Sequence, residues 1–286
     1  MEYKKGDRVK HPTRDDWGLG EVLEDSHSDK VNIFFTEEGE KTFSLKYIQL
    51  IQVKGEEAKH PVLDNLNVSN SSNKIKYQSL SKSINKFLQL YPNGFCGEKY
   101  REAQRNHKVK AHQLASELLN LEDFEKFLHE LNYDEICKRA LKVANATNLV
   151  FPKEKKSLKD GLSTTTGKKH FSESLYQLLY GASNLARRFN DFSKVLKDIG
   201  TAKWTTISYF LFIVFPEKYM FVKPKVTKDA AEISAFEINY HPELNWLTYK
   251  SILTFSEYLK KELSALKLRD MIDVQSFMWC IAKSTT

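Results

Sequence analysis

The chain has 286 residues, enough for one large domain or two unequal ones. Its hydrophobic fraction of 41% and aromatic fraction of 12% supply a well-filled core, which excludes disorder as the default state. The formal charge of +7 favours an anionic partner such as nucleic acid, although many basic proteins bind none.

The three cysteines, Cys96, Cys137 and Cys280, are far apart in the sequence and form no Cys-x-x-Cys or Cys-x-His cluster. We therefore expect no disulfide framework, no metal and no cofactor, and a reducing, cytoplasmic location. The first residues contain no apolar signal-peptide run, and the longest apolar segment, 207–215, is shorter than the ~20 residues that a membrane span needs. We expect no membrane partner.

Residues 1–55 show the alternation typical of short strands, with "TEEGE" as a hairpin turn. Five strands in so short a segment predict a small closed barrel. The segment resembles the Tudor or SH3-like module at the C-terminal end of UvrD-type helicases. The residues that carry this resemblance are Gly6–Val9, His11–Pro12, Trp17–Gly18, Gly20, Val22 and the hairpin from Phe34 to Phe43.

Charge is divided unevenly between this segment and the remaining chain. Residues 1–55 hold 9 Lys and Arg against 11 Asp and Glu, a net of −2, so the rest of the chain carries +9. A barrel with this balance is a poor phosphate clamp, and we expect it to dock a protein or to orient the larger domain. Residues 56–80 are rich in Ser and Asn and predict a linker.

From residue 81 to residue 286 the apolar residues recur at helical spacing, which predicts an all-α domain of about eight helices. The fold class is therefore α+β in two domains. One helix is expected to end at Ile199–Gly200 and an apolar helix to begin near Trp204, with a short turn between them. This is the pattern of a helix-hairpin-helix, whose turn directs backbone N–H groups at a phosphate. An ordinary helix–Gly–helix corner fits equally well.

The stretch "FPEKYMFVKPKVTKDAA" resembles the corresponding part of helix-hairpin-helix DNA glycosylases. Two positions depart from that pattern, because Lys223 stands where the catalytic aspartate is expected and Trp204 stands where bifunctional members have a lysine. Phrases across residues 85–282, such as "NLVFPKEKKSLKDGL", "NYHPELNWLTY" and "LRDMIDVQSFMW", resemble a bacterial family that includes an anti-phage DNA glycosylase. That resemblance implies double-stranded phage DNA as the partner, α-glucosylated 5-hydroxymethylcytosine as the excised base, and abasic sites as the product.

Cleavage of an N-glycosidic bond builds positive charge on the sugar and needs a carboxylate, or an amine that attacks C1′. Among the carboxylates Asp229, Asp270 and Asp273, we single out Asp273, which lies in apolar surroundings. It can pair with Lys223 in a catalytic cavity, or with an arginine in a structural bridge. Lys223 is the candidate amine, and its alternative role is a phosphate contact.

Further residues complete the predicted site. The predicted DNA contacts are Gly200, Thr201, Lys203, Trp204, Lys225, Arg187 and Arg188. The predicted base pocket consists of Tyr176, Tyr180, Gln275 and Trp246, with core packing as the alternative for the aromatic side chains. The lysine-rich segment "PKEKKSLKD" either carries substrate contacts or is a solvated surface.

The sequence thus predicts a monofunctional DNA glycosylase. The alternative is a non-catalytic DNA-binding adaptor of a helicase or repair complex, in which the hairpin grips phosphate and the barrel recruits a protein.

Overall fold

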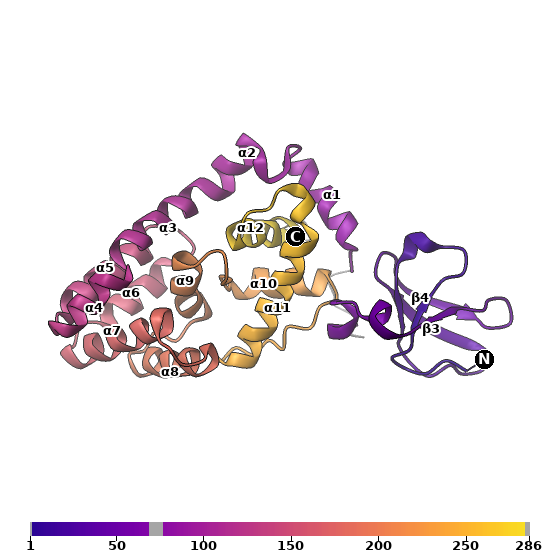
Figure 1. Ribbon diagram of the computed structural model, residues 1–286, viewed down its shortest axis with the longest axis horizontal. Coiled ribbons are helices and arrows are strands. Elements are labelled where there is room, and N and C mark those ends of the chain that lie inside the picture. The colour runs from indigo at the N-terminus through magenta and orange to yellow at the C-terminus, as the bar shows by residue number, and fades with distance from the viewer. Residues whose placement is uncertain (1, 69–76, 284–286) are drawn as a thin grey trace. The chain divides into compact units, whose positions relative to one another are not determined.

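The computed structural model describes residues 2–68 and 77–283, and part of the predicted linker, 69–76, lies outside them. The chain divides into two compact units (Figure 1). The first comprises the described residues up to Leu90, the segment Asp229–Glu237 and the chain from Ile281. The second comprises Tyr91–Lys228 and Ile238–Cys280.

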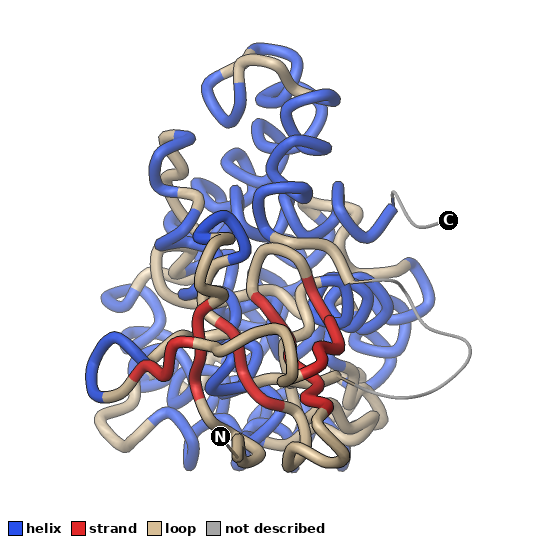
Figure 2. Tube along the Cα trace, turned by 90° about the vertical axis from the view of Figure 1, so that its right-hand side faces the viewer, coloured by secondary structure: helices blue, strands red, loops and turns tan. Residues whose placement is uncertain are grey.

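The first unit contains one antiparallel sheet, drawn in red in Figure 2. Its five strands follow the order β4-β3-β2-β1-β5. Their bounds are β1 Arg8–Lys10, β2 Gly20–Val22, β3 Lys30–Phe35, β4 Gly39–Ser44 and β5 Ile51–Val53. The expected turn between Phe35 and Gly39 is confirmed, and Gly39 takes the positive φ of 79° that such a turn requires. Gly20 is fixed by packing, since a Cβ there would lie 2.8 Å from the Ile33 side chain.

One face of this sheet forms the core of the first unit, around Tyr3, Val9, Ile33 and Phe35. The segment that follows the sheet contains short 3-10 turns, η2 Gly55–Ala58 and η3 Leu63–Asn65, before helix α1, Leu80–Leu90. A bridge between Leu66 and Phe236 explains why Asp229–Glu237 joins this unit.

The predicted helical content after residue 80 is confirmed, although the described chain has more helices than the eight expected, and α1, Asp229–Glu237 and the chain from Ile281 belong to the first unit. The helices that follow α1 are α2 Glu98–Tyr100, α3 Asn106–Leu118, α4 Leu121–His129, α5 Tyr133–Asn145, α6 Pro152–Gly161, α7 Thr165–Tyr180, α8 Leu185–Asp198, α9 Trp204–Val214, α10 Pro224–Ile233, α11 Trp246–Glu262 and α12 Met271–Lys283. Every residue of α9 is buried, which accounts for its continuous apolar sequence.

A π-helical turn, η5 Arg101–Arg105, joins α2 to α3. Hydrogen bonds from i to i+5 widen this turn, so residues five apart come close to the same face. Tyr100 and Arg105 are five apart, and both reach the same carboxylate oxygen of Asp273 on α12. The turn therefore positions the polar groups of the candidate site.

Candidate functional site

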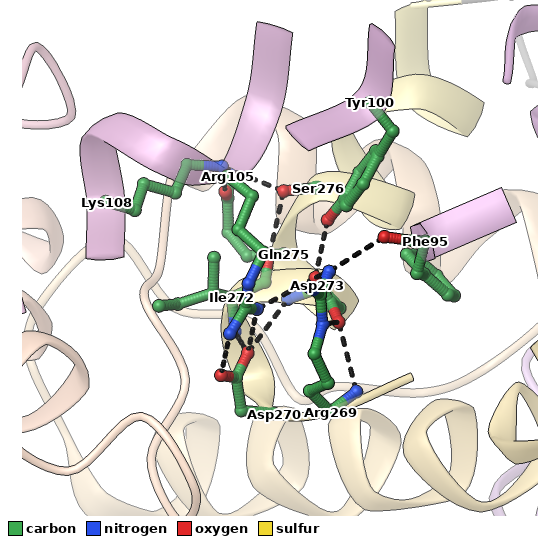
Figure 3. Close-up of polar contacts among 10 residues, drawn as sticks. All are labelled: Phe95, Tyr100, Arg105, Lys108, Arg269, Asp270, Ile272, Asp273, Gln275 and Ser276. Carbon is green, nitrogen blue, oxygen red and sulfur yellow. Dashed lines mark hydrogen bonds and ion pairs between the residues drawn. The ribbon is translucent and has the colours of Figure 1, made fainter. Parts of the chain in front are cut away.

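Asp273 is fully buried at the centre of a charged network on α12 (Figure 3). Its Oδ1 accepts from the Tyr100 hydroxyl at 2.7 Å and from Arg105 Nη1 at 2.9 Å. Arg269 adds its backbone N–H at 3.0 Å and its Nε at 2.9 Å, both to Oδ2, and its Nη2 at 3.1 Å to Oδ1. These five hydrogen bonds fill the roughly four acceptor positions of a carboxylate.

The same network is electrically balanced. Arg105 also binds Asp270 through Nη1 at 2.7 Å and Nη2 at 2.6 Å, so two arginines face two carboxylates. Burial, followed by the charge of Asp273, raises the pKa of Tyr100. Of the two predicted arrangements, the structure shows the arginine bridge. Lys223 is not among the partners of Asp273 in the described chain, so the expected pairing of the two in one cavity is wrong.

A separate cavity of about 170 Å³ lies on another side of α12. We call it the Lys108 cavity. It is lined by Ala103, Gln104, His107, Lys108, Asn148, Leu149, Lys223, Gln275 and Trp279. Among these described lining residues none is an aspartate or a glutamate. The volume is several times the roughly 30 Å³ that one water molecule takes in the liquid, so a ring-sized group fits.

Lys108 on α3 is the most unusual group of this cavity, since only 3% of its surface is exposed. Its Nζ donates to Gln275 Oε1 at 2.6 Å and to Ser276 Oγ at 2.9 Å (Figure 3). Both acceptors are neutral, and the more distant charges of Asp273 and Asp270 offset the removal of the ammonium from water only in part. Burial lowers the pKa of Lys108 to about 7. Near neutral pH a large fraction of this amine is therefore unprotonated.

Lys223 lies at the wall of the same cavity, just before α10. Its Nζ is 4.4 Å from the ring centroid of Phe151 and 5.2 Å from that of Trp279, so aromatic rings flank the amine. His107 also lines the cavity, and burial followed by the Lys108 charge lowers the pKa of its imidazole. The cavity thus combines two amines with a weakly basic imidazole.

The turn between α8 and α9 has the predicted boundaries. Gly200 adopts a φ of 73° after the end of α8, and Thr201 N–H donates to Leu196 O at 2.8 Å. Gly200 and Lys203 are exposed and can meet a ligand, whereas Thr201 is buried. Trp204 does not fit its predicted role as a DNA contact, because its side chain is 3% exposed and its Nε1 donates to His241 O at 2.9 Å.

Of the remaining predicted DNA contacts, two are exposed and Arg188 is half-buried. Arg187 is exposed and lies 3.8 Å from Asp191, and Lys225 is exposed in the first turn of α10. Arg188 donates to Leu178 O at 2.8 Å, so its side chain satisfies a backbone carbonyl in the last turn of α7. None of these contacts tests binding to DNA, which stays a prediction.

The predicted base pocket is brought together only in part. Gln275 lines the Lys108 cavity with Lys223. Tyr176 and Tyr180 instead pack around Phe124, and Trp246 packs against Phe189 and Tyr249. For these three aromatic residues the structure supports the alternative of core packing, since none of them lines the cavity.

Sequence reasoning missed Lys108, His107 and Trp279. The signal for Lys108 was its spacing, because Lys108, Ala111 and Ala115 lie on one buried face of α3. A lysine in line with small buried residues points inward, even though the helix is polar overall.

Other features of the described chain limit the possible chemistry. Within the described ranges, no three His, Cys, Asp or Glu side chains gather so as to hold a metal ion. None of the helices in those ranges is long and apolar enough to cross a bilayer. The three cysteines are free, and burial raises the pKa of Cys137.

Comparison with known proteins concerns only the sheet. Residues 3–53 match a family model described as a protein of unknown function, DUF3553. No curated protein and no solved structure gives a significant match to the chain. The likeness to DNA glycosylases therefore stays a prediction from the residues.

Proposed function

We propose that the protein is a DNA glycosylase with a helix-hairpin-helix at the α8–α9 turn, and that a flipped base enters the Lys108 cavity. The lining of that cavity is the observation that carries the proposal. It combines two lysines, three side-chain amides and an indole, and the described lining contains no carboxylate. The resemblance suggests the substrate class, a glucosylated hydroxymethylcytosine in phage DNA.

The neutral groups of the cavity suit a nucleobase. The amides of Gln104, Asn148 and Gln275 each offer donors and an acceptor, which is what reading the edge of a base requires. The indole of Trp279 offers a ring face for stacking. A base held in this way would be out of the DNA stack, where its glycosidic bond is accessible.

The amines suit an amine route to cleavage. In its neutral form Lys223 Nζ attacks C1′, a bond forms between nitrogen and C1′, and the glycosidic electron pair leaves with the base. The nitrogen then gives up its extra proton to water, and the ring oxygen leaves C1′ and takes up a proton, which yields the imine that borohydride reduces. The Lys108 ammonium protonates the departing base, a task for which a pKa of about 7 is well matched. This route replaces the water route that Asp273 was expected to serve, because the acceptor positions of Asp273 are filled.

Base release from modified DNA tests the proposal. The full chain is incubated with T4-type DNA and with unmodified DNA, abasic sites are detected by alkaline cleavage, and borohydride traps any covalent adduct. We expect release from T4-type DNA and a trapped adduct. Lys223→Met should lose both by at least about 100-fold, and Lys108→Met should slow release. Lys110→Met, an exposed lysine of the same helix, is the matched control and should change nothing.

Two results would contradict parts of this proposal. Release without any trapped adduct would refute the amine route and favour activated water. No release from either DNA would refute the enzyme. DNA binding without release would support the adaptor, a second candidate that is favoured by the saturated hydrogen bonding of Asp273.

For the first unit we propose a Tudor or SH3-like barrel that binds a protein, in a chain that works in the cytoplasm. The net charge of −2 over residues 1–55 argues against a phosphate ligand. Tyr47 is 90% exposed and Ile51 52% exposed, and exposed side chains of this kind are typical of protein contacts.

A further inference from the structure

A groove of about 600 Å³ lies between α5, α6 and the start of α7, and it shares no lining residue with the Lys108 cavity. We call it the lysine groove. Its lining includes six lysines: Lys138, Lys142, Lys155, Lys156, Lys159 and Lys168. The described lining contains one carboxylate, Asp134.

Most of this positive charge is not neutralised within the groove. Lys168 pairs with Asp134, and Lys138 lies 3.2 Å from Glu135. Lys142, Lys156 and Lys159 form no ion pair with any carboxylate of the described chain. A run of charges on a convex helix is commonly solvated, but six lysines around one hollow repel one another and concentrate a positive potential there. Such a hollow attracts a polyanion.

The two ends of α6 connect the groove to the sites already described. At its C-terminal end, a Cβ on Gly161 would lie 2.4 Å from Ile199 O, so α6 packs directly against the residue that precedes Gly200. Near its N-terminal end, Lys155 Nζ donates to Thr147 O at 2.6 Å, and the next residue, Asn148, lines the Lys108 cavity. The lysines therefore flank a path that runs from the α8–α9 turn along α6.

The length of this path suits a nucleic-acid strand. A helix of 10 residues is about 15 Å long. One strand of B-form DNA carries one phosphate per about 3.4 Å of the duplex axis, so a helix as long as α6 that lies along this axis spans about four phosphates. Lysines that are spread along such a length match a repeating row of charges better than a single small anion.

We propose that the lysine groove holds the sugar–phosphate backbone of a DNA strand that continues from the α8–α9 turn. The contact is independent of base sequence, because lysine ammonium groups meet phosphate oxygens and read no base edge. The inference rests on the proposed function only in taking DNA as the ligand, and it assigns no chemistry to the groove.

Salt-dependent binding tests this groove. The triple variant Lys142→Gln, Lys156→Gln, Lys159→Gln is compared with a control triple, Lys110→Gln, Lys250→Gln, Lys261→Gln, which removes the same charge from exposed positions on α3 and α11. Binding of the full chain to a fluorescent DNA duplex is measured by anisotropy over a range of salt concentrations. We expect the groove triple to lower the salt slope by about 3, and the affinity at low salt by at least about tenfold. The control triple should lower the slope by less than about 1.

Further variants and readouts separate the possible failures. A triple Lys→Arg variant of the same groove positions should bind like the unaltered protein, which excludes loss of folding as the cause. Equal effects of the groove and control triples on DNA binding, or no effect of either, would refute the proposal that the lysine groove binds the DNA backbone. If the unaltered protein releases no base but the groove triple still weakens DNA binding, the proposed glycosylase activity is refuted, and the proposed DNA-binding role of the lysine groove is still supported.

Discussion

Helix α12 carries two buried polar clusters that differ in how their charge is balanced. Around Asp273, two carboxylates face two arginines, and every charge has a partner. Around Lys108, one amine meets only the neutral oxygens of Gln275 and Ser276. Both clusters join α12 to the same helical stretch before and within α3.

The two central groups differ in whether their direct partners carry an opposite charge. A buried carboxylate with its acceptor positions filled has none left for another ligand, whereas burial lowers the pKa of an amine whose direct partners are neutral to about 7. Burial alone therefore does not distinguish the two groups, and the partners of each group do.

The largest expected effect concerns Asp273. Asp273→Asn removes the negative charge that faces Arg105 and Arg269, and should lower the free energy of unfolding by about 3–5 kcal/mol. Urea unfolding followed by circular dichroism measures the change. Asp270→Asn is the control, because its partly exposed side chain lets water replace the lost contacts, and it should cost about 1–3 kcal/mol. Unchanged stability with lost base release would return a catalytic role to Asp273.

The next effect is a pH dependence that isolates Lys108. Between about pH 7 and the usual lysine pKa of 10.5, the unfolded chain binds a proton at this position and the folded chain does not, so the stability of the unaltered protein rises with pH there. Lys108→Met has no titrating amine at this position. As pH falls from 10 to 7, the free energy of unfolding of the variant should therefore rise by up to about 4 kcal/mol relative to that of the unaltered protein, and it should rise little further below pH 7.

Unfolding of both proteins in urea across this pH range measures the difference. Groups common to both chains titrate alike and largely cancel, and Lys110→Met should show no such trend, because its side chain is exposed. A flat difference across the range would mean that Lys108 keeps its proton in the folded protein, and the contrast between the two clusters would disappear.

Local sequence signals predicted local structure well. Gly200 marked the end of α8, and "TEEGE" marked the turn between β3 and β4, because each depends on backbone conformations within a few residues. Arg269 lies only four residues before Asp273, a spacing that a sequence can reveal. The other partners of Asp273, Tyr100 and Arg105, and the two acceptors of Lys108 lie at least 167 residues from the groups they bind, beyond any periodic pattern. The π-helical turn that aligns Tyr100 with Arg105 has no composition of its own, so this long-range part of the network was not predictable from one sequence.

The smallest predicted effect is the contribution of one neutral partner, the Tyr100 hydroxyl, to the stability of the cluster around Asp273. Tyr100→Phe removes the hydroxyl that donates to Asp273 Oδ1 at 2.7 Å, while Arg105 and Arg269 keep the carboxylate paired. We expect a loss of about 1–2 kcal/mol in the free energy of unfolding, measured in urea. Ser276→Ala removes one of the two acceptors of Lys108 in the described part of the chain, and should lower the pKa of that amine further. A larger loss for Tyr100→Phe than for Asp273→Asn would show that the arginines do not hold the carboxylate, because charge balance would then not be what stabilises this cluster.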